Sequence, residues 1–206
     1  MKRLLCYGDS NTWGTIPGTW GGRYDENIRW TKRLAKILGG EFEVIEEGFR
    51  GRNIAQDDEK FPRGNRNGAL FFSQCVLTHD PVDYLILMLG TNNLKLEFDY
   101  DAEKCARAIG KYYIEHLREN LAQDLIKVPQ IILIAPCKIR DVVDKFKGAE
   151  EKSKYFNECY KTLAQKKNCY FVENDILEAG EDGLHLTAES HTRLAERLAS
   201  LIKQIV

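Results

Sequence analysis

Ser10 lies near the start of the chain, in a setting that suits nucleophilic chemistry. It ends the tripeptide Gly8-Asp9-Ser10, which follows the apolar run Leu4–Tyr7. A glycine allows a tight turn after a strand, and such a turn can expose the hydroxyl that follows it. Attack on an acyl group also requires a base for the hydroxyl proton and donors for the oxyanion. Taken alone, the tripeptide is better explained as a cap of the next segment, so a catalytic role for Ser10 depends on partners elsewhere in the chain.

A candidate base lies near the other end of the chain, in Asp182-Gly183-Leu184-His185. Three-residue spacing in a loop lets the Asp182 carboxylate reach Nδ1 of His185. That contact fixes the tautomer and leaves Nε2 free to accept a proton from a serine. By itself, His185 also fits the start of a surface helix. The remaining histidines lack such a neighbour and are expected to be structural or solvated; they are His79, His116 and His191.

Two further positions offer donors for an oxyanion. Asn92 lies in Gly90-Thr91-Asn92-Asn93, directly after the apolar run Tyr84–Leu89, and its amide can donate a hydrogen bond. Gly51 permits the close approach of a backbone N–H. Glycine and asparagine favour turns in any case, so turn formation is the alternative explanation for both residues.

The elements that must position these residues alternate between apolar runs and helical stretches. The predicted strands are Leu4–Tyr7, Phe42–Ile45, Tyr84–Leu89, Ile131–Ala135 and Cys169–Val172. The predicted helices are Ile28–Leu38, Asn67–Thr78, Asp101–Lys127, Ala149–Lys166 and Thr187–Ile205. Continuous apolar strands separated by helices predict one α/β domain over residues 1–206, with a five-stranded parallel sheet. Ligands bind beyond the carboxyl ends of such strands, and all the candidate residues above follow strands.

Taken in order, these segments resemble the blocks of the SGNH/GDSL hydrolases. The first block is Cys6-Tyr7-Gly8-Asp9-Ser10 and the second is Val44-Ile45-Glu46-Glu47-Gly48 followed by Gly51-Arg52. The third is Met88-Leu89-Gly90-Thr91-Asn92 and the fourth is Asp182-x-x-His185. The resemblance runs from Leu4 to the last helix and is closest to the bacterial arylesterase and acyltransferase branch. It implies a three-layer α/β/α, flavodoxin-like fold.

The resemblance also implies roles for these residues. Ser10 would be the nucleophile, His185 the general base, and Asp182 the group that orients His185. The N–H groups of Ser10 and Gly51, with the Asn92 side chain, would form the oxyanion hole. The resemblance implies no metal and no organic cofactor, and a small-molecule ester as the substrate.

Four residues are candidates for substrate binding. Asn11 and Trp13 flank Ser10, and Ile139 follows the fourth predicted strand, where it would line an acyl pocket. Arg50 precedes Gly51; it would either favour an anionic or sugar-like substrate or point to solvent. The glycine-rich loop Gly14–Gly22 either folds over the site or is ordinary packing.

Two positions depart from the family pattern, namely the bulky cation Arg50 before Gly51 and Asn93. Asn93 follows Asn92 where the family usually has aspartate. We expect this change to alter the hydrogen bonding behind the site without abolishing activity.

The composition excludes several other classes of protein. The chain has 206 residues, 30 Lys+Arg and 31 Asp+Glu, so the net charge of -1 gives no basic excess for nucleic acid. A local basic cluster is either a solvated loop or a phosphate site; it comprises Arg50, Arg52, Arg63 and Arg66. The six cysteines show no C-x-x-C pair and no zinc-like spacing with histidine, so we expect buried thiols and no metal site.

The chain is also expected to be cytoplasmic and not bound to membranes. Its longest apolar runs, Tyr84–Leu89 and Ile131–Pro136, are far shorter than the roughly 18 residues of a membrane span. Only Leu4–Tyr7 follows the basic start, which is too short for a signal peptide. The related branch often forms dimers or larger assemblies, and the sequence leaves open whether this chain is a homo-oligomer.

The sequence therefore predicts a serine esterase for short-chain esters, with acyl transfer or perhydrolysis as further outcomes of the same acyl-enzyme. The alternatives within enzymes are a carbohydrate O-deacetylase similar to acetyl xylan esterases, a thioesterase or a lysophospholipase. A binding module without activity is disfavoured because the set of Ser, Gly, Asn, Asp and His residues is complete. A nucleotide binder is disfavoured because no phosphate-binding glycine motif follows a strand.

Overall fold

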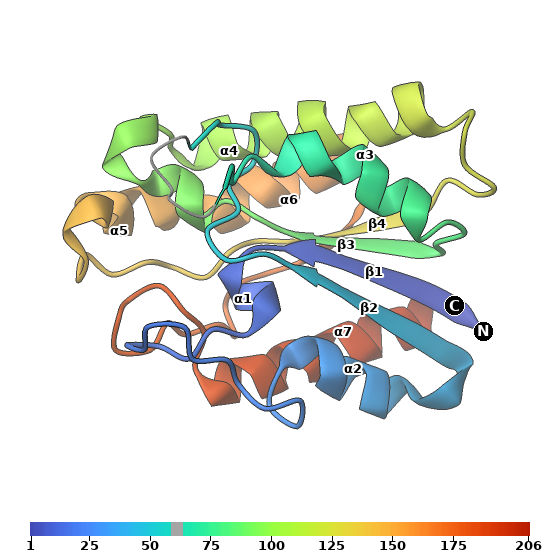
Figure 1. Cartoon of the computed structure of the whole chain (residues 1–206), viewed down its shortest axis with the longest axis horizontal. Coiled ribbons are helices and arrows are strands. Elements are labelled where there is room, and N and C mark those ends of the chain that lie inside the picture. The colour runs from blue at the N-terminus through green and yellow to red at the C-terminus, as the bar shows by residue number, and fades with distance from the viewer. Residues whose placement is uncertain (59–63) are drawn as a thin grey trace.

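Five strands form a single parallel sheet at the centre of the molecule. The structure is a computed structural model that describes residues 1–58 and 64–206 (Figure 1). The strand order is β2-β1-β3-β4-β5, and every neighbouring pair is parallel. The strands are β1 (Lys2–Gly8), β2 (Phe42–Gly48), β3 (Tyr84–Met88), β4 (Gln130–Ile134) and β5 (Tyr170–Val172). The predicted five-stranded parallel sheet is confirmed.

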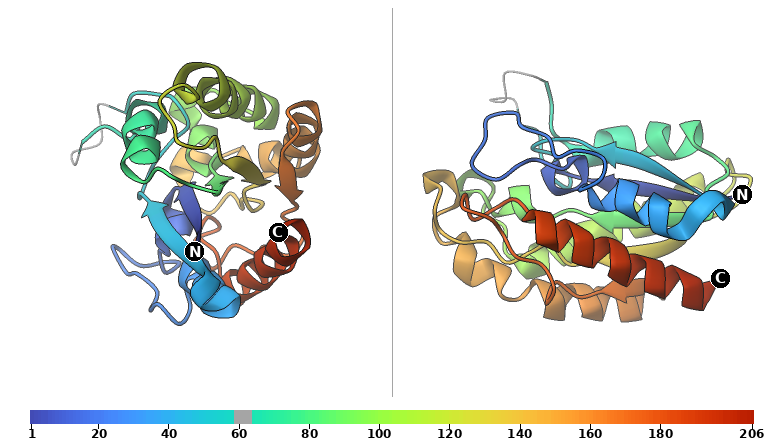
Figure 2. Two further views of the ribbon diagram at one scale, coloured as in Figure 1. Left: turned by 90° about the vertical axis from the view of Figure 1, so that its right-hand side faces the viewer. Right: turned by 90° about the horizontal axis from the view of Figure 1, so that it is seen from below.

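Helices cover both faces of this sheet and complete the three predicted layers (Figure 1). One face carries α3 (Gly68–Thr78), α4 (Ala102–Ile109) and α6 (Phe156–Lys166). A π-helical segment, Gly110–Leu121, continues α4 directly. The other face carries α2 (Trp30–Leu38) and α7 (Ala188–Ile205), which lie side by side in Figure 2. The shorter elements are α1 (Ser10–Trp13), α5 (Ala149–Ser153) and the 3₁₀ turns Gly39–Glu41, Thr91–Leu94, Leu96–Phe98 and Asp144–Phe146.

The core divides into two clusters because successive strand residues point to opposite faces. Leu5 and Leu85 pack with the layer of α3, α4 and α6. Leu4 and Ile86 pack with α2 and α7. Burial on both faces explains why these strands read as continuous apolar runs in the sequence.

Two predicted helices differ from the observed ones. The helix predicted over Asp101–Lys127 ends at Leu121, where the Asp124 N–H donates to the Leu121 carbonyl and closes a turn. The Ile126 N–H then donates to the Asp80 carboxylate at 2.9 Å, which directs the chain toward β4. The helix predicted over Ala149–Lys166 is divided into α5 and α6. It breaks just after Ser153, whose hydroxyl accepts a hydrogen bond from the Ile139 N–H at 2.9 Å.

Two glycines allow α1 to lie close against the carboxyl ends of β1 and β2. A Cβ at Gly48 would lie 2.2 Å from the backbone nitrogen of Trp13. A Cβ at Gly8 would lie 2.0 Å from Oγ1 of Thr12 and 2.9 Å from the carbonyl oxygen of Met88. Because a Cβ at either position would collide with α1 or with the strand beside it, these two glycines determine how closely α1 approaches the strands.

Within the described residues, no helix combines the length and the apolar character needed to cross a membrane.

Candidate active site

Ser10, His185 and Asp182 form a continuous hydrogen-bonded line at the carboxyl edge of the sheet. Nε2 of His185 lies 3.0 Å from Oγ of Ser10, and Nδ1 of His185 lies 2.6 Å from Oδ2 of Asp182. Two loops 175 residues apart in the chain thus meet as the sequence predicts. The Ser10 residue is only 6% exposed, so its hydroxyl lies in a recess rather than on an open surface.

Backbone donors hold the Asp182 carboxylate in place. Oδ1 accepts hydrogen bonds from the N–H groups of Leu184 and His185, both at 2.9 Å, and Oδ2 accepts one from Gly18 at 3.0 Å. Burial raises the pKa of the Asp182 carboxyl, but the bonds from the His185 ring and from these N–H groups outweigh burial. The pKa is therefore held well below its usual range. Asp182 stays ionised and aimed at the imidazole.

Ser10 is the first residue of α1, and Asp9 caps that helix. The Asp9 carboxylate accepts a hydrogen bond from the Asn11 N–H at 2.9 Å. Burial raises the Asp9 pKa to about 6, although the Asn11 N–H and the nearby charges of His185 and Arg52 oppose the rise. Asp9 thus adjoins Ser10 in the chain and feels the charge of His185.

Asn11 was expected from the sequence to contact the substrate, but its side chain instead binds the backbone around His185. Its Nδ2 donates to the Leu184 carbonyl at 3.2 Å, and its Oδ1 accepts from the Leu186 N–H at 2.9 Å. The residue is 3% exposed. Asn11 therefore joins the loop that bears Ser10 to the residues on either side of His185.

Gly51 and Asn92 come together through the backbone of Arg52. Gly51 has a φ of 79° at the third position of a turn closed by the Arg52 N–H and the Phe49 carbonyl, a conformation that favours glycine. Nδ2 of Asn92 donates to the Arg52 carbonyl at 3.1 Å. An asparagine amide carries two hydrogens, so a second donor remains for an oxyanion.

Arg52 is a positioning residue that the sequence analysis did not identify. Its buried guanidinium donates to the Gly8 carbonyl at 2.9 Å and to the Glu47 carbonyl, and it lies 3.9 Å from the centre of the Tyr7 ring. These contacts tie the ends of β1 and β2 to the turn of Gly51. In the sequence, Arg52 is indistinguishable from the solvated cations around it.

The other cations of the predicted basic cluster also face aromatic rings. The Arg50 guanidinium lies 5.2 Å from the centre of the Trp13 ring, and that of Arg66 lies 4.2 Å from the Phe49 ring. Arg63 lies outside the described residues. Trp13, three residues after Ser10 in α1, also meets the Arg23 guanidinium at 4.9 Å. Arg50 is thus placed against a residue of the helix that bears Ser10.

The structure does not bring Ile139 to the site as a pocket residue. Ile139 is 1% exposed and belongs to the core cluster under α4 and α6, with its N–H bound to Ser153. Strand-end position alone could not show this, because the residues after β4 turn back into the core.

Asn93, which replaces the usual aspartate, lies behind Asn92 and is fully buried. Its Oδ1 accepts from the Ile54 N–H at 2.9 Å, and its Nδ2 donates to the Gln56 side chain. The amide thus has a donor and an acceptor partner.

The loop Gly14–Gly22 reaches the site through its backbone. The Gly18 N–H binds Asp182, and a Cβ at Gly180 would lie 2.5 Å from Cγ of Pro17. Trp20 is 88% exposed, so this ring does not cover the serine. The loop thus binds Asp182 through the Gly18 N–H, and at its start the N–H groups of Gly14 and Thr15 donate to the Ser10 carbonyl.

The other histidines have structural contacts. His191 is buried and its Nδ1 accepts from the Trp30 N–H at 3.2 Å, which joins α7 to α2. Burial and the charges of Arg29 and His185 lower the His191 pKa to about 3. Nε2 of His116 lies 2.8 Å from the Ser73 hydroxyl, and His79 pairs with Glu47.

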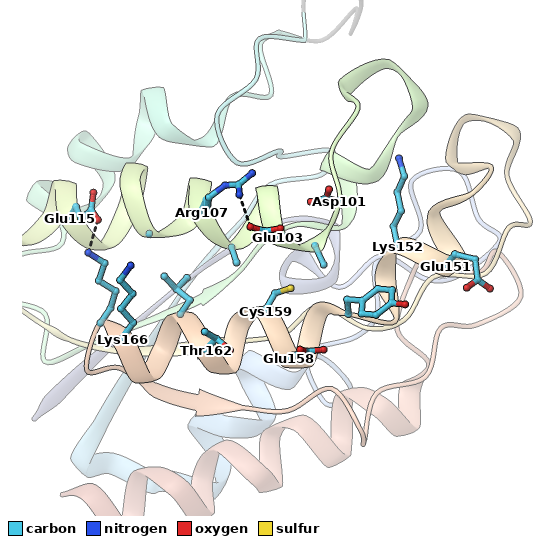
Figure 3. A pocket seen from close by; sticks show the side chains of 16 residues that line it. Asp101, Glu103, Arg107, Glu115, Glu151, Lys152, Glu158, Cys159, Thr162 and Lys166 are labelled. Atoms are coloured by element: carbon cyan, nitrogen blue, oxygen red, sulfur yellow. Dashed lines mark hydrogen bonds and ion pairs between the residues drawn. The ribbon is translucent and has the colours of Figure 1, made fainter.

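A large groove lies elsewhere, between α4 and α6 (Figure 3). Its volume is about 1090 Å³. The ion pair of Arg107 with Glu103 lies along α4, and the ion pair of Lys167 with Glu115 joins the end of α6 to the π-helical segment that follows α4. Ser10, Asp182 and His185 are not among its lining residues, so it is separate from the site described above.

The chain is similar to known proteins over nearly its whole length. A model of the GDSL-like lipase/acylhydrolase family matches residues 6–193. An aryl esterase from M. smegmatis is 30% identical, with full coverage of both chains and a TM-score of 0.90. A carbohydrate acetylesterase from Sinorhizobium meliloti is 30% identical, again with full coverage of both chains, with a TM-score of 0.91. No curated protein matches the chain.

A family model that spans most of the sequence and two full-length structural relatives give one answer: the chain belongs to the GDSL-like lipase/acylhydrolase family and is a carboxylic ester hydrolase with the SGNH hydrolase fold.

Proposed function

We propose that the enzyme hydrolyses short-chain carboxylic esters through an acyl-enzyme on Ser10. The observation that carries the proposal is the line from Ser10 through His185 to Asp182, with contacts of 3.0 and 2.6 Å. This is the arrangement in which an imidazole accepts the serine proton while a carboxylate holds its tautomer.

The reaction has two halves. Oγ of Ser10 attacks the ester carbonyl while Nε2 of His185 takes the hydroxyl proton, and the N–H groups of Ser10 and Gly51 with the Asn92 amide hold the oxyanion. The proton on His185 then passes to the leaving alcohol, and the acyl group remains on Ser10. A water activated by His185 attacks the acyl-enzyme, which releases the acid and restores the serine.

Carbohydrate O-deacetylation is the second candidate, since the S. meliloti relative is a carbohydrate acetylesterase. The M. smegmatis relative is an aryl esterase. Both relatives are 30% identical to this chain, so they support aryl esters and acetylated carbohydrates equally as candidate substrates. Aryl ester hydrolysis and carbohydrate deacetylation would both pass through an acyl group on Ser10. They differ in the leaving group, which is a phenol in the first reaction and a sugar hydroxyl in the second.

The proposal is tested with p-nitrophenyl esters from acetate to octanoate, in parallel with acetylated xylose. We expect the greatest kcat/KM at an acyl length of about two to four carbons, since the S. meliloti relative is an acetylesterase. A higher kcat/KM for acetylated xylose than for p-nitrophenyl acetate would assign the enzyme to sugar deacetylation. A maximum at octanoate would contradict the short-chain proposal.

Acyl transfer is a further proposal for the same intermediate. The acyl-enzyme on Ser10 can in principle react with any hydroxyl that reaches it, so an added alcohol would compete with water as the acceptor. With an alcohol present, we expect a new ester beside the free acid. Product ratios equal to those of a control in water alone would count against acyl transfer.

A further inference from the structure

Three side chains of types that can bind a metal lie close together outside the active site, where the end of β2 meets the end of α3. Glu47 is the next-to-last residue of β2, Cys75 lies in the last turns of α3, and His79 caps that helix. The potential ligand atoms of all three lie within 4.8 Å of one another. Nε2 of His79 is already 2.9 Å from Oε1 of Glu47. This set is called the Glu47 cluster below.

The ligand types of the Glu47 cluster suit zinc, and their spacing is close to that of a zinc site. Residues four apart on a helix share a face, so Cys75 and His79 point to the same side of α3. Thiolate sulfur, imidazole nitrogen and carboxylate oxygen are the three ligand types that zinc prefers. Ligand atoms around a tetrahedral zinc ion lie about 3.3 to 3.8 Å apart, so small side-chain rotations would bring these three into place.

We propose that Glu47, Cys75 and His79 bind one Zn²⁺ ion, with solvent as the fourth ligand.

Exposure and charge support the proposal. All three residues are partly exposed, with 23% of the His79 side chain and 34% of the Glu47 side chain accessible, so an ion can enter and keep a water. A carboxylate and a thiolate together balance the two charges of the ion. Two cations lie nearby, but the Arg52 guanidinium is directed to the carbonyls of Gly8 and Glu47, and the Arg3 guanidinium to the His79 carbonyl and the Glu43 carboxylate.

The backbone around His79 is already fixed, which lowers the entropy cost of binding. The His79 N–H donates to the carbonyls of Cys75 and Val76, and the His79 carbonyl accepts from the Arg3 guanidinium at 2.6 Å. Only side-chain torsions therefore need to change when the ion binds.

The proposed ion does not take part in ester hydrolysis. The Glu47 cluster shares no residue with the line of Ser10, His185 and Asp182. Ester hydrolysis is therefore expected to survive treatment with a chelator. The zinc proposal and the proposed function can be tested independently, because failure of one does not affect the other.

Cobalt titration of the full-length, chelator-stripped, reduced protein tests the proposal. Co²⁺ replaces Zn²⁺ in such sites and gives a thiolate-to-metal charge-transfer band that reports a bound cysteine. We expect about one equivalent of Co²⁺ to bind with this band, and Zn²⁺ to displace it. No charge-transfer band with the wild-type protein would overturn the proposal.

Paired variants identify the ligands. Cys75→Ala should remove the band, and His79→Ala and Glu47→Gln should each weaken Zn²⁺ binding at least about tenfold, since even outer-shell changes cost that much. The matched controls are Cys159→Ala and His116→Ala, which alter another partly exposed cysteine and the histidine paired with Ser73. Retained p-nitrophenyl acetate hydrolysis shows that each variant is folded. Equal Zn²⁺ affinity in Cys75→Ala and Cys159→Ala would also overturn the assignment.

Discussion

At the scale of single residues, the reaction depends on how firmly the His185 ring is held. Asp182 receives three backbone N–H groups as well as the imidazole, so the carboxylate has little freedom to turn away. The ring nitrogen opposite this bond then faces Ser10 at 3.0 Å. In the proposed mechanism Asp182 orients the ring, whereas His185 itself moves the proton.

This difference predicts an order of effects for two substitutions. Asp182→Asn leaves a base in the site but disturbs its tautomer, whereas His185→Ala removes the base. We expect kcat to fall by about 10⁴-fold for Asp182→Asn and by about 10⁶-fold for His185→Ala. Steady-state hydrolysis of p-nitrophenyl acetate measures both. A larger loss in Asp182→Asn would mean that Asp182 does not orient the histidine.

A second residue-scale prediction concerns Asp9. Its pKa is raised from 3.8 to about 6 by burial, so the folded state holds its proton more tightly than the unfolded state does. The stability cost of ionising Asp9 is absent below about pH 4 and grows as the pH rises to about 6. The difference of about two pKa units corresponds to a cost of up to about 3 kcal/mol at neutral pH.

We therefore expect Asp9→Asn to stabilise the protein at pH 8 and to have little effect at pH 4. Urea unfolding of both proteins at the two pH values measures the difference. The amide oxygen can still accept from Asn11, so the cap is retained. A stability difference that is the same at both pH values would contradict the raised pKa.

At the scale of elements, the site depends on contacts between loops that follow different strands. Asn11 joins the loop after β1 to the residues around His185, and Arg52 joins the ends of β1 and β2 to Asn92. The sequence could predict Asp182 and His185 because they lie only three residues apart. It could predict Ser10 because this serine directly follows a strand. The contacts of Asn11 and Arg52 could not, because a polar side chain near a strand end does not reveal which loop it will bind.

Arg52 gives a prediction at this scale. Arg52→Met removes the donor to two carbonyls, and an unsatisfied buried acceptor costs about 1–3 kcal/mol. We expect a lower midpoint of thermal unfolding and a lower kcat, because the turn of Gly51 loses its support. The matched control is Arg50→Met, which removes a cation two residues earlier. Equal thermal midpoints for the two variants would contradict the positioning role of Arg52.

The close packing of α1 against the end of β2 gives another prediction. Gly48→Ala would place a Cβ 2.2 Å from the Trp13 nitrogen, so α1 and Ser10 must shift. Overpacking of this kind costs about 1–3 kcal/mol, and we expect kcat to fall with stability. Gly40→Ala is the control, since a Cβ there meets nothing within 4 Å. Calorimetry and p-nitrophenyl acetate hydrolysis measure both effects; unchanged activity in Gly48→Ala would show that α1 need not lie so close.

At the scale of the whole molecule, the fold was largely predictable and one cluster was not. Continuous apolar strands and intervening helices predicted the parallel sheet because burial on both faces leaves that pattern. The helix ends at Leu121 and Ser153 were missed, since they depend on bonds to Asp80 and Ile139 far away in the sequence. The Glu47 cluster was missed because its third ligand comes from β2, 28 residues before Cys75.

The most direct test of the central claim compares Ser10→Ala with the wild-type enzyme in p-nitrophenyl acetate hydrolysis. Ser200→Ala, at an exposed position of α7, is the matched control. We predict that Ser10→Ala loses hydrolysis while its thermal midpoint stays within a few degrees of the wild type, and that Ser200→Ala keeps both. Substantial hydrolysis by folded Ser10→Ala would contradict Ser10 as the nucleophile and, with it, the acyl-enzyme mechanism.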